Sequence, residues 1–465
     1  MLLTQIEAVV SGRHARRAQG PLPFPERPVG TDCLPEVRHI VIVMMENHSF
    51  DNYLGLLGRG DGLPTDQQGH VTATNPGPGG RVVPATHLAS TRQHAGVPTQ
   101  SWESSHLQWA GGTNAGFATA VERCTPGADP AIAMGYWTAA DLPFYHGLAR
   151  TFPVADRWFA SCLGPTIPNR RFLIAGTALG LTSDRLSRCF DYPPNGTIFD
   201  LLSYHGIGWA DYHSVSAARS ALSHASGRHV LRSARFARHR LEHVTQRLTG
   251  DDDRAKSYLQ FSADAYPLGL LRYAAHLRTV DRFVADAAAG TLPAVSIVDP
   301  DFRTDSEENP QDITIGESFA ARVINAALHG ADWLGTLLVW CYDEHGGYHD
   351  HVPPPEAVEP DDRAPDAPGP FRYDRYGFRV PAVIVSPFAR PGYVSHVTHD
   401  HTSLLKLIER KWNLPPLTAR DEAADDLLDA VDFGSPPAFA VPPELPPPVR
   451  PAPVEGSISE GRTAG

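Results

Sequence analysis

The chain has 465 residues, of which 42% are hydrophobic, and it carries 52 acidic residues against 40 lysines and arginines. A chain of this length and composition can bury a sizeable core, and one large α/β sheet with insertions can account for most of it. The formal net charge of −12 argues against nucleic acid as a partner, because phosphate backbones select basic surfaces.

Residues 1–35 are predicted to form an N-terminal arm rich in Arg, Pro and Gly. Its first residues lack a basic start and contain Glu7, so we expect no secretory signal peptide and a cytoplasmic location. No run of about 18 apolar residues occurs, so no membrane-spanning segment is expected. The cysteines show no CxxC spacing and are expected to be mostly reduced, although a disulfide between Cys124 and Cys189 stays open.

The first predicted strand runs from Ile40 to Met45, an unbroken apolar run that ends at Glu46 and Asn47. Such a run is typical of a strand buried on both faces of a parallel sheet. Ligands bind at the carboxyl ends of these strands in open α/β sheets, and both side chains offer hard oxygen ligands for a divalent metal. The alternative is a strand that ends in an ordinary polar turn.

A candidate nucleophile follows at Thr166, within the segment GPTIPNRRFLIAG. Gly164 and Pro165 predict a turn, and Pro168 suits the first position of a helix that continues to Ala175. Thr166 would then lie at or just before the helix N-terminus, where backbone N–H groups and the helix dipole favour anions. The alternative is that Thr166 is an ordinary helix N-cap.

Further elements are predicted along the chain. Residues 67–98 are polar and rich in Gly and Pro, which indicates a long surface excursion, and residues 213–290 indicate a helical insertion over the site. Strands are expected at 294–298 and 382–385, with helices at 316–328 and at 403–412, the latter capped by Thr402. After residue 433 the Pro-rich composition predicts a disordered tail.

The apolar run from Leu337 repeats the pattern of the first strand, because it ends at Asp343 and Glu344 and is followed by a Gly-Gly turn. Adjacent carboxylates normally repel one another and raise each other's pKa. A bound cation reverses that penalty, so this pair predicts a metal site. A solvated acidic turn is the alternative.

The motifs MMENHSFDNYLG, GPTIPNR and YDEHGGYHDHVPPP together resemble those of the bacterial phosphoesterase family that includes phosphatidylcholine-type phospholipase C and acid phosphatases. Further matching segments place the resemblance at about residues 36–433, in the expected order. It implies an α/β fold like that of alkaline phosphatase, with a mainly parallel sheet sandwiched between helices. Residues 36–433 would form the catalytic domain and residues 434–465 the tail.

The resemblance also implies the site. Glu46 and Asn47 match the family's first metal-binding pair, Asp343 and Glu344 match the second, and Thr166 matches the nucleophile and completes the metal site. Oxygen ligands suit Ca²⁺, Mg²⁺ or Mn²⁺, and Zn²⁺ stays possible. The implied reaction is metal-dependent hydrolysis of a phosphate ester through a phosphothreonine intermediate.

The sequence departs from the family where many relatives carry histidines thought to hold the phosphate or protonate the leaving group. Gln100 and Asn309 stand at these positions. We expect them to bind substrate together with His106 and His345, and His106, His345 or His401 to be the imidazole that substitutes. The alternative is a catalytically silent protein that binds a phosphate ligand.

The substrate is expected to be a small phosphate ester or a phospholipid head group. Trp102, Trp109 and Tyr348 could form an aromatic box for choline, although packing is the simpler role for such residues. The sequence does not separate phosphomonoesters from phosphodiesters.

Overall fold

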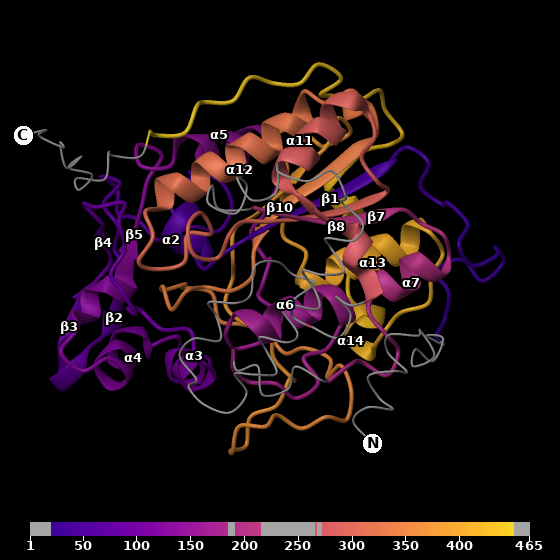
Figure 1. Cartoon of the computed structure of the whole chain (residues 1–465). Helices are drawn as coiled ribbons and strands as arrows, with labels where there is room; N and C mark the ends of the chain where they lie inside the picture. The colour runs from indigo at the N-terminus through magenta and orange to yellow at the C-terminus, as the bar shows by residue number, and fades with distance from the viewer. Residues whose placement is uncertain (1–19, 185–190, 215–265, 267–271, 451–465) are drawn as a thin grey trace, which may run out of the picture.

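The computed structural model of the protein describes residues 20–184, 191–214, 266 and 272–450 (Figure 1). Its main sheet contains strands β1 (His39–Met45), β6 (Val154–Ala155), β7 (Trp209–His213), β8 (Leu277–Thr279), β9 (Val295–Asp299), β10 (Thr336–Tyr342), β11 (Ala382–Val385) and β12 (Val394–Ser395). These eight strands lie in the order β12-β6-β11-β10-β1-β9-β7-β8. Among them only β11 runs against the others, so the sheet is mainly parallel, as predicted.

Helices cover both faces of this sheet (Figure 1). One layer contains α5 (Pro143–Thr151), α11 (Val280–Ala289) and α12 (Ile313–Leu328), and the other contains α6 (Thr166–Ala175), α7 (Ile198–Tyr204), α13 (His401–Lys411) and α14 (Ala419–Ala423). The apolar runs Ile40 to Met45 and Leu337 to Tyr342 are at most 1% exposed, because helices pack on both sides of their strands. The predicted α/β class, with a sheet between helices, is confirmed.

The helix at the C-terminal end of the domain begins earlier than predicted. α13 starts at His401, and its N-cap is Asp400, whose Oδ1 accepts a hydrogen bond from the Thr402 main-chain N–H at 3.2 Å. Thr402 is therefore inside the first turn, and the prediction that it caps the helix is wrong. A carboxylate both accepts the free amide and interacts favourably with the positive end of the helix dipole.

The predicted surface excursion at 67–98 is mostly exposed, and it also contributes to a small lobe beside the sheet. The lobe contains β2 (Thr74–Pro76), β3 (Val82–Pro84), β4 (Thr86–His87), α3 (Trp102–Trp109), α4 (Phe117–Cys124) and β5 (Gly135–Tyr136). Val83 and Val97 are buried in a core that includes Phe117 and Met134. The segment is ordered because these few apolar side chains have a partner surface further along the chain.

The predicted insertion at 213–290 contains part of the main domain. Residues 277–289 form β8 and α11, which belong to the main sheet and to one of its helix layers. Residues 215–265 and 267–271, with the helical segment predicted there, lie outside the described residues.

The first part of the predicted disordered tail packs on the domain. The ring of Phe439 lies 4.7 Å from that of Phe152, and the Trp333 indole N–H donates to the Phe439 carbonyl at 2.8 Å. The tail prediction is wrong for this part, because one aromatic residue among the prolines finds an apolar contact. Residues 451–465 lie outside the described part.

Short elements complete the described chain: α2 (Phe50–Leu54) and the 3-10 helices Pro78–Gly80, Ala110–Gly112, Pro130–Met134, Ala274–His276, Trp333–Gly335 and Leu428–Ala430. Of the cysteines, Cys33, Cys124, Cys162 and Cys341 are free thiols, and Cys189 lies outside the described residues. No helix in the described ranges is long and apolar enough to cross a membrane.

Candidate active site

The two predicted acidic segments lie side by side at the carboxyl edge of the sheet. β1 and β10 pair in parallel with Met45 opposite Tyr342, so Glu46 and Asp343 are the next residues of neighbouring strands. The Asp343 main-chain N–H donates to the Met45 carbonyl at 3.2 Å, which continues the strand pairing. The side chains of Glu46 and Asp343 are buried, as the sequence predicted for strand-end ligands.

The loop after β10 needs its glycines for a close approach of the backbone. Gly346 has a φ of +64°, and a Cβ there would lie 1.8 Å from the Asn47 carbonyl oxygen. The Gly346 N–H also donates to Oε2 of Glu344 at 2.7 Å. The Gly-Gly turn thus lets the segments after β1 and β10 touch, and its amide holds the Glu344 carboxylate.

Thr166 is the first residue of α6, and Pro165 precedes it as the N-cap residue. The helix therefore starts two residues before Pro168, and the prediction that Pro168 opens the helix is wrong. A proline is tolerated at this place because the first-turn amides of a helix have no acceptor within the helix. The position of Thr166 at the helix N-terminus agrees with the prediction.

Two oxygen atoms of the predicted site are buried and have no hydrogen-bond partner among the residues that the structure describes. They are Oγ1 of Thr166 and Oδ1 of Asn47, on side chains that are 3% and 4% exposed. Burying a polar atom without a partner costs free energy, so such atoms usually serve a ligand or the chemistry of the site. Hard oxygen atoms of this kind fit a divalent cation.

Arg170 is a further member of the site. Its guanidinium donates to Oδ2 of Asp343 at 3.2 Å and to Oδ1 of Asp299 at 2.7 Å, and it lies 3.5 Å from Oε1 of Glu46. Burial raises the pKa of Asp343, the Arg170 charge lowers it, and the resulting pKa is about 7. The sequence contained a signal for both Arg170 and Asp299, because Arg170 follows Thr166 by one helical turn and Asp299 ends another apolar strand.

The two positions that depart from the family lie close together. Nδ2 of Asn309 donates to the carbonyl of Pro98 at 3.3 Å, two residues before the buried Gln100. The segment at 98–100 also contacts the loop after β10, because a Cβ on Gly347 would lie 2.5 Å from the Thr99 carbonyl oxygen. The substitutions for the family's histidines therefore border the Gly-Gly turn.

The three histidines considered as substitutes are buried and hydrogen-bonded to protein atoms. His345 shares a 2.7 Å hydrogen bond with Gln108, His106 with the Trp102 carbonyl at 2.7 Å, and His401 with the Asp343 carbonyl at 2.6 Å. Burial lowers the pKa of His345 to about 3 and that of His106 and His401 to about 4. Each imidazole is therefore neutral at pH 7 and serves as a hydrogen-bonding group.

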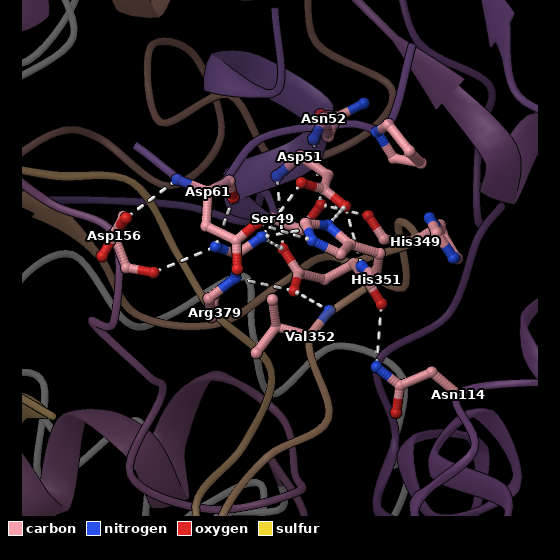
Figure 2. Close-up of polar contacts among 12 residues, drawn as sticks. Ser49, Asp51, Asn52, Asp61, Asn114, Asp156, His349, His351, Val352 and Arg379 are labelled. Atoms are coloured by element: carbon pink, nitrogen blue, oxygen red, sulfur yellow. Dashed lines mark hydrogen bonds and ion pairs between the residues drawn. The ribbon is translucent and has the colours of Figure 1, made fainter. Parts of the chain in front are cut away.

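A second charged cluster lies beside the site, built from Asp51, Asp350 and His351 (Figure 2). Their ligand atoms lie within 4.8 Å of one another, and among the described residues this is the one such group of three. However, the guanidinium of Arg379 lies between the carboxylates, 3.0 Å from Asp51 and 2.8 Å from Asp350. The Arg379 guanidinium therefore supplies the positive charge that balances these carboxylates, and we interpret the cluster as an ion-pair network.

Buried carboxylates at parallel strand ends and a hydroxyl at a helix N-terminus define a class: α/β enzymes that act on anionic esters. Residues 37–415 match the model of the Phosphoesterase family. Because this match covers more than half of the chain, the chain belongs to this family. The prediction of a phosphoric ester hydrolase is confirmed at this level.

Named relatives agree with the family. Phospholipase C B of Mycobacterium tuberculosis (strain ATCC 25618 / H37Rv) is 30% identical over 449 residues, covering 87% of this chain and 79% of that protein. Non-specific phospholipase C6 of Arabidopsis thaliana is 27% identical over 437 residues, covering 88% and 75%. The family and these relatives support hydrolysis of phosphate esters.

A comparison of folds gives a match to the crystal structure of a protein in the alkaline phosphatase superfamily from Vibrio parahaemolyticus. The identity is 8% and the TM-score 0.37, with 92% of this chain and 79% of that chain covered. At that TM-score the likeness decides nothing. The fold class rests on the sheet and helix layers described above.

Proposed function

We propose that the protein hydrolyses phosphodiesters of the phospholipid head-group type and that Thr166 is its nucleophile. The observation that carries the proposal is the Thr166 hydroxyl, which is buried at the N-terminus of α6 with no described hydrogen-bond partner. Its oxygen attacks phosphorus, the P–O bond to the leaving alcohol breaks, and the hydroxyl's proton is balanced by the one that this alcohol takes up. The phosphothreonine that forms still carries the second ester group of the substrate. Water then attacks the phosphorus, the P–O bond to Thr166 breaks, the hydroxyl is restored and a phosphomonoester leaves.

A divalent metal fits the oxygen atoms of this site. Asn47 offers an oxygen atom without a described partner, and Glu46, Asp343 and Glu344 offer carboxylates at adjacent strand ends. When bound, the ion supplies positive charge that activates the hydroxyl and offsets the charge of the phosphoryl oxygens. Oxygen ligands favour Ca²⁺, Mg²⁺ or Mn²⁺, and the carboxylates leave Zn²⁺ possible.

The charge of the site favours a diester over a monoester. Glu46, Asp299, Asp343 and Glu344 are four buried acidic side chains, and the charges of Arg170 and of one bound divalent ion together do not exceed theirs. A phosphodiester carries one negative charge where a phosphomonoester carries about two at neutral pH, so it meets less repulsion. The phospholipase names of the relatives point the same way.

A comparison of substrates tests the proposal. Phosphatidylcholine vesicles, bis(4-nitrophenyl) phosphate and 4-nitrophenyl phosphate are assayed with Mg²⁺, Mn²⁺, Ca²⁺ and Zn²⁺ in turn, from acid to alkaline pH. We expect turnover of the two diesters and slower turnover of the monoester. Faster turnover of the monoester contradicts the phosphodiesterase assignment.

A catalytically silent phosphate-binding protein is the second candidate. It is favoured by the neutral, hydrogen-bonded states of His106, His345 and His401 and by Gln100 and Asn309 at the family's histidine positions. Binding of inorganic phosphate without turnover of any of these substrates supports this candidate.

A further inference from the structure

Arg170 connects the nucleophile helix to the strands that carry the metal-ligand residues. It follows Thr166 by four residues on α6, so both side chains lie on the same face of the helix, one turn apart. Its contacts reach Asp299 after Val298 of β9, Glu46 after β1 and Asp343 after β10. These three strands are neighbours in the sheet, in the order β10-β1-β9.

The guanidinium is fully engaged by the protein. Its side chain is 2% exposed, and Nη2 also lies 3.4 Å from the carbonyl oxygens of Met44 and Met45. The ring of Phe302 packs over the guanidinium with its centroid 4.4 Å away. Arg170 therefore has no open face toward a substrate phosphate. It can affect the reaction only by orienting the side chains that it contacts.

We propose that Arg170 is a positioning residue of the phosphoryl-transfer site, an inference that rests on the proposed function. Anchored on Asp299, its planar guanidinium holds the Glu46 and Asp343 carboxylates in the orientation that a divalent cation requires. The same contacts fix the rotation of α6, and with it the direction of the Thr166 hydroxyl. A fork of fixed geometry is needed, because the donors of an ammonium group diverge from one nitrogen on a flexible stem and do not fix the orientation of carboxylates on neighbouring strands.

The test uses R170K, which keeps the positive charge and removes the fork. Arg171 provides the matched control as R171K, because it is also 2% exposed on α6 but donates to the Ala178 carbonyl and packs over Tyr266. Three quantities are measured on the full chain: Mn²⁺ affinity from the free-ion EPR signal, kcat at saturating substrate and Mn²⁺, and stability by urea unfolding.

We expect R170K to lower Mn²⁺ affinity or kcat by about 10- to 100-fold, as for other residues that orient metal ligands. R171K should change neither, whatever it does to stability. An R170K protein with unchanged Mn²⁺ affinity and unchanged kcat overturns the inference. So does a result in which inhibition by inorganic phosphate weakens while kcat and Mn²⁺ affinity stay the same, because Arg170 would then bind the substrate.

D299N is the second variant, because it weakens the anchor of Arg170 without touching a metal-ligand residue. It should lower Mn²⁺ affinity and kcat in the same direction, and combining it with R170K should add little, since both disturb one contact. If the effects of the two substitutions on Mn²⁺ affinity and kcat add up in the double variant, the shared role is contradicted. If R170K does not fold, the same measurements on D299N test the inference. Absence of turnover in the wild-type protein contradicts the proposed function, and the Mn²⁺ measurement still decides the role of Arg170.

Discussion

Ile167 and Asp184 are joined at the start of the nucleophile helix: the Ile167 main-chain N–H donates to Oδ1 of Asp184 at 2.9 Å. This amide belongs to the first turn of α6, next to Thr166, where the helix dipole favours a negative group. The sequence predicted an anion-binding helix N-terminus, and the structure places a carboxylate of the protein there. We therefore expect Asp184 to compete with a phosphoryl group for this amide.

Asp184→Asn should tighten inhibition by inorganic phosphate. The substitution removes a negative charge from the place where a phosphoryl oxygen would accept the Ile167 N–H, and it lowers repulsion of the incoming anion. The inhibition constant for phosphate is measured at fixed substrate and metal. If metal affinity falls instead, Asp184 is a metal ligand, and the prediction that it competes with phosphate for the Ile167 N–H is wrong.

Thr166→Ala should leave the fold intact and lower turnover by several orders of magnitude, because the attacking oxygen is gone. Thr166→Ser should keep substantial activity, and mass spectrometry of wild-type enzyme quenched during turnover of bis(4-nitrophenyl) phosphate should locate a phosphoryl group that retains one nitrophenyl ester on Thr166. Thr177→Ala is the control, because that hydroxyl lies after the C-terminal end of α6 and donates to Asp361 at 2.6 Å. Near-normal turnover of Thr166→Ala shows that water is the attacking group.

The sequence predicted the strands of the site well because apolar runs with polar ends are local patterns. Ile40 to Met45 and the run from Leu337 need no knowledge of their neighbours to be recognised as buried strands, and Glu46 and Asp343 follow from them. Their side-by-side placement depends on sheet order, which a parallel α/β fold restricts strongly.

The sequence could not predict contacts made between distant segments. No local pattern specifies the path of the loop that brings Asp184 to α6. The sequence also does not show that Arg170 contacts Asp299, because this contact depends on how the sheet is assembled. For the same reason the sequence does not predict the burial of Val83 and Val97, since another segment contributes the apolar surface that buries them.

Metal binding should depend on the strand-end carboxylates. Replacing both Asp343 and Glu344 with Ala should abolish stoichiometric Mn²⁺, measured by elemental analysis after gel filtration. Asp51→Asn is the matched control, because Arg379 already neutralises the neighbouring cluster. Loss of the ion in Asp51→Asn, with retention in the double variant, would move the metal to that cluster.

Glu307 should be important for stability. Its carboxyl group accepts hydrogen bonds from the hydroxyls of Tyr53 and Tyr145 at 3.0 and 2.7 Å and from that of Tyr342. Burial raises the pKa of Glu307 well above its usual range, against the hydrogen bonds from the three hydroxyls, which lower it.

Glu307→Leu leaves these buried hydroxyls without their acceptor and should cost about 3 kcal/mol or more in the free energy of unfolding. Glu307→Gln keeps a hydrogen-bond acceptor on a side chain of nearly the same shape, so it should cost much less. Urea denaturation of both variants gives the comparison, and equal losses would show that shape rather than hydrogen bonding matters at this position.

His351 should make stability depend on pH. Its Nδ1 lies 2.8 Å from Oδ2 of Asp51 and its Nε2 lies 3.1 Å from Oδ1 of Asp61 (Figure 2). Burial lowers the pKa of His351, but the hydrogen bond to Asp51 and the charges of Asp51 and Asp350 raise it by a larger amount. The pKa therefore rises from the ordinary 6.5 to about 9. The folded protein therefore holds this proton more tightly than the unfolded chain.

A group whose pKa is raised by folding stabilises the protein fully below its unfolded pKa and loses that effect as pH rises through its folded pKa. The contribution of His351 should thus be complete below pH 6.5 and lost by about pH 9. His351→Gln removes the titrating group and keeps hydrogen-bonding atoms. The difference in unfolding free energy between wild type and this variant, measured by urea denaturation across this range, should be constant in acid and shrink as the pH rises. A difference that does not change with pH shows that folding does not shift the pKa of His351.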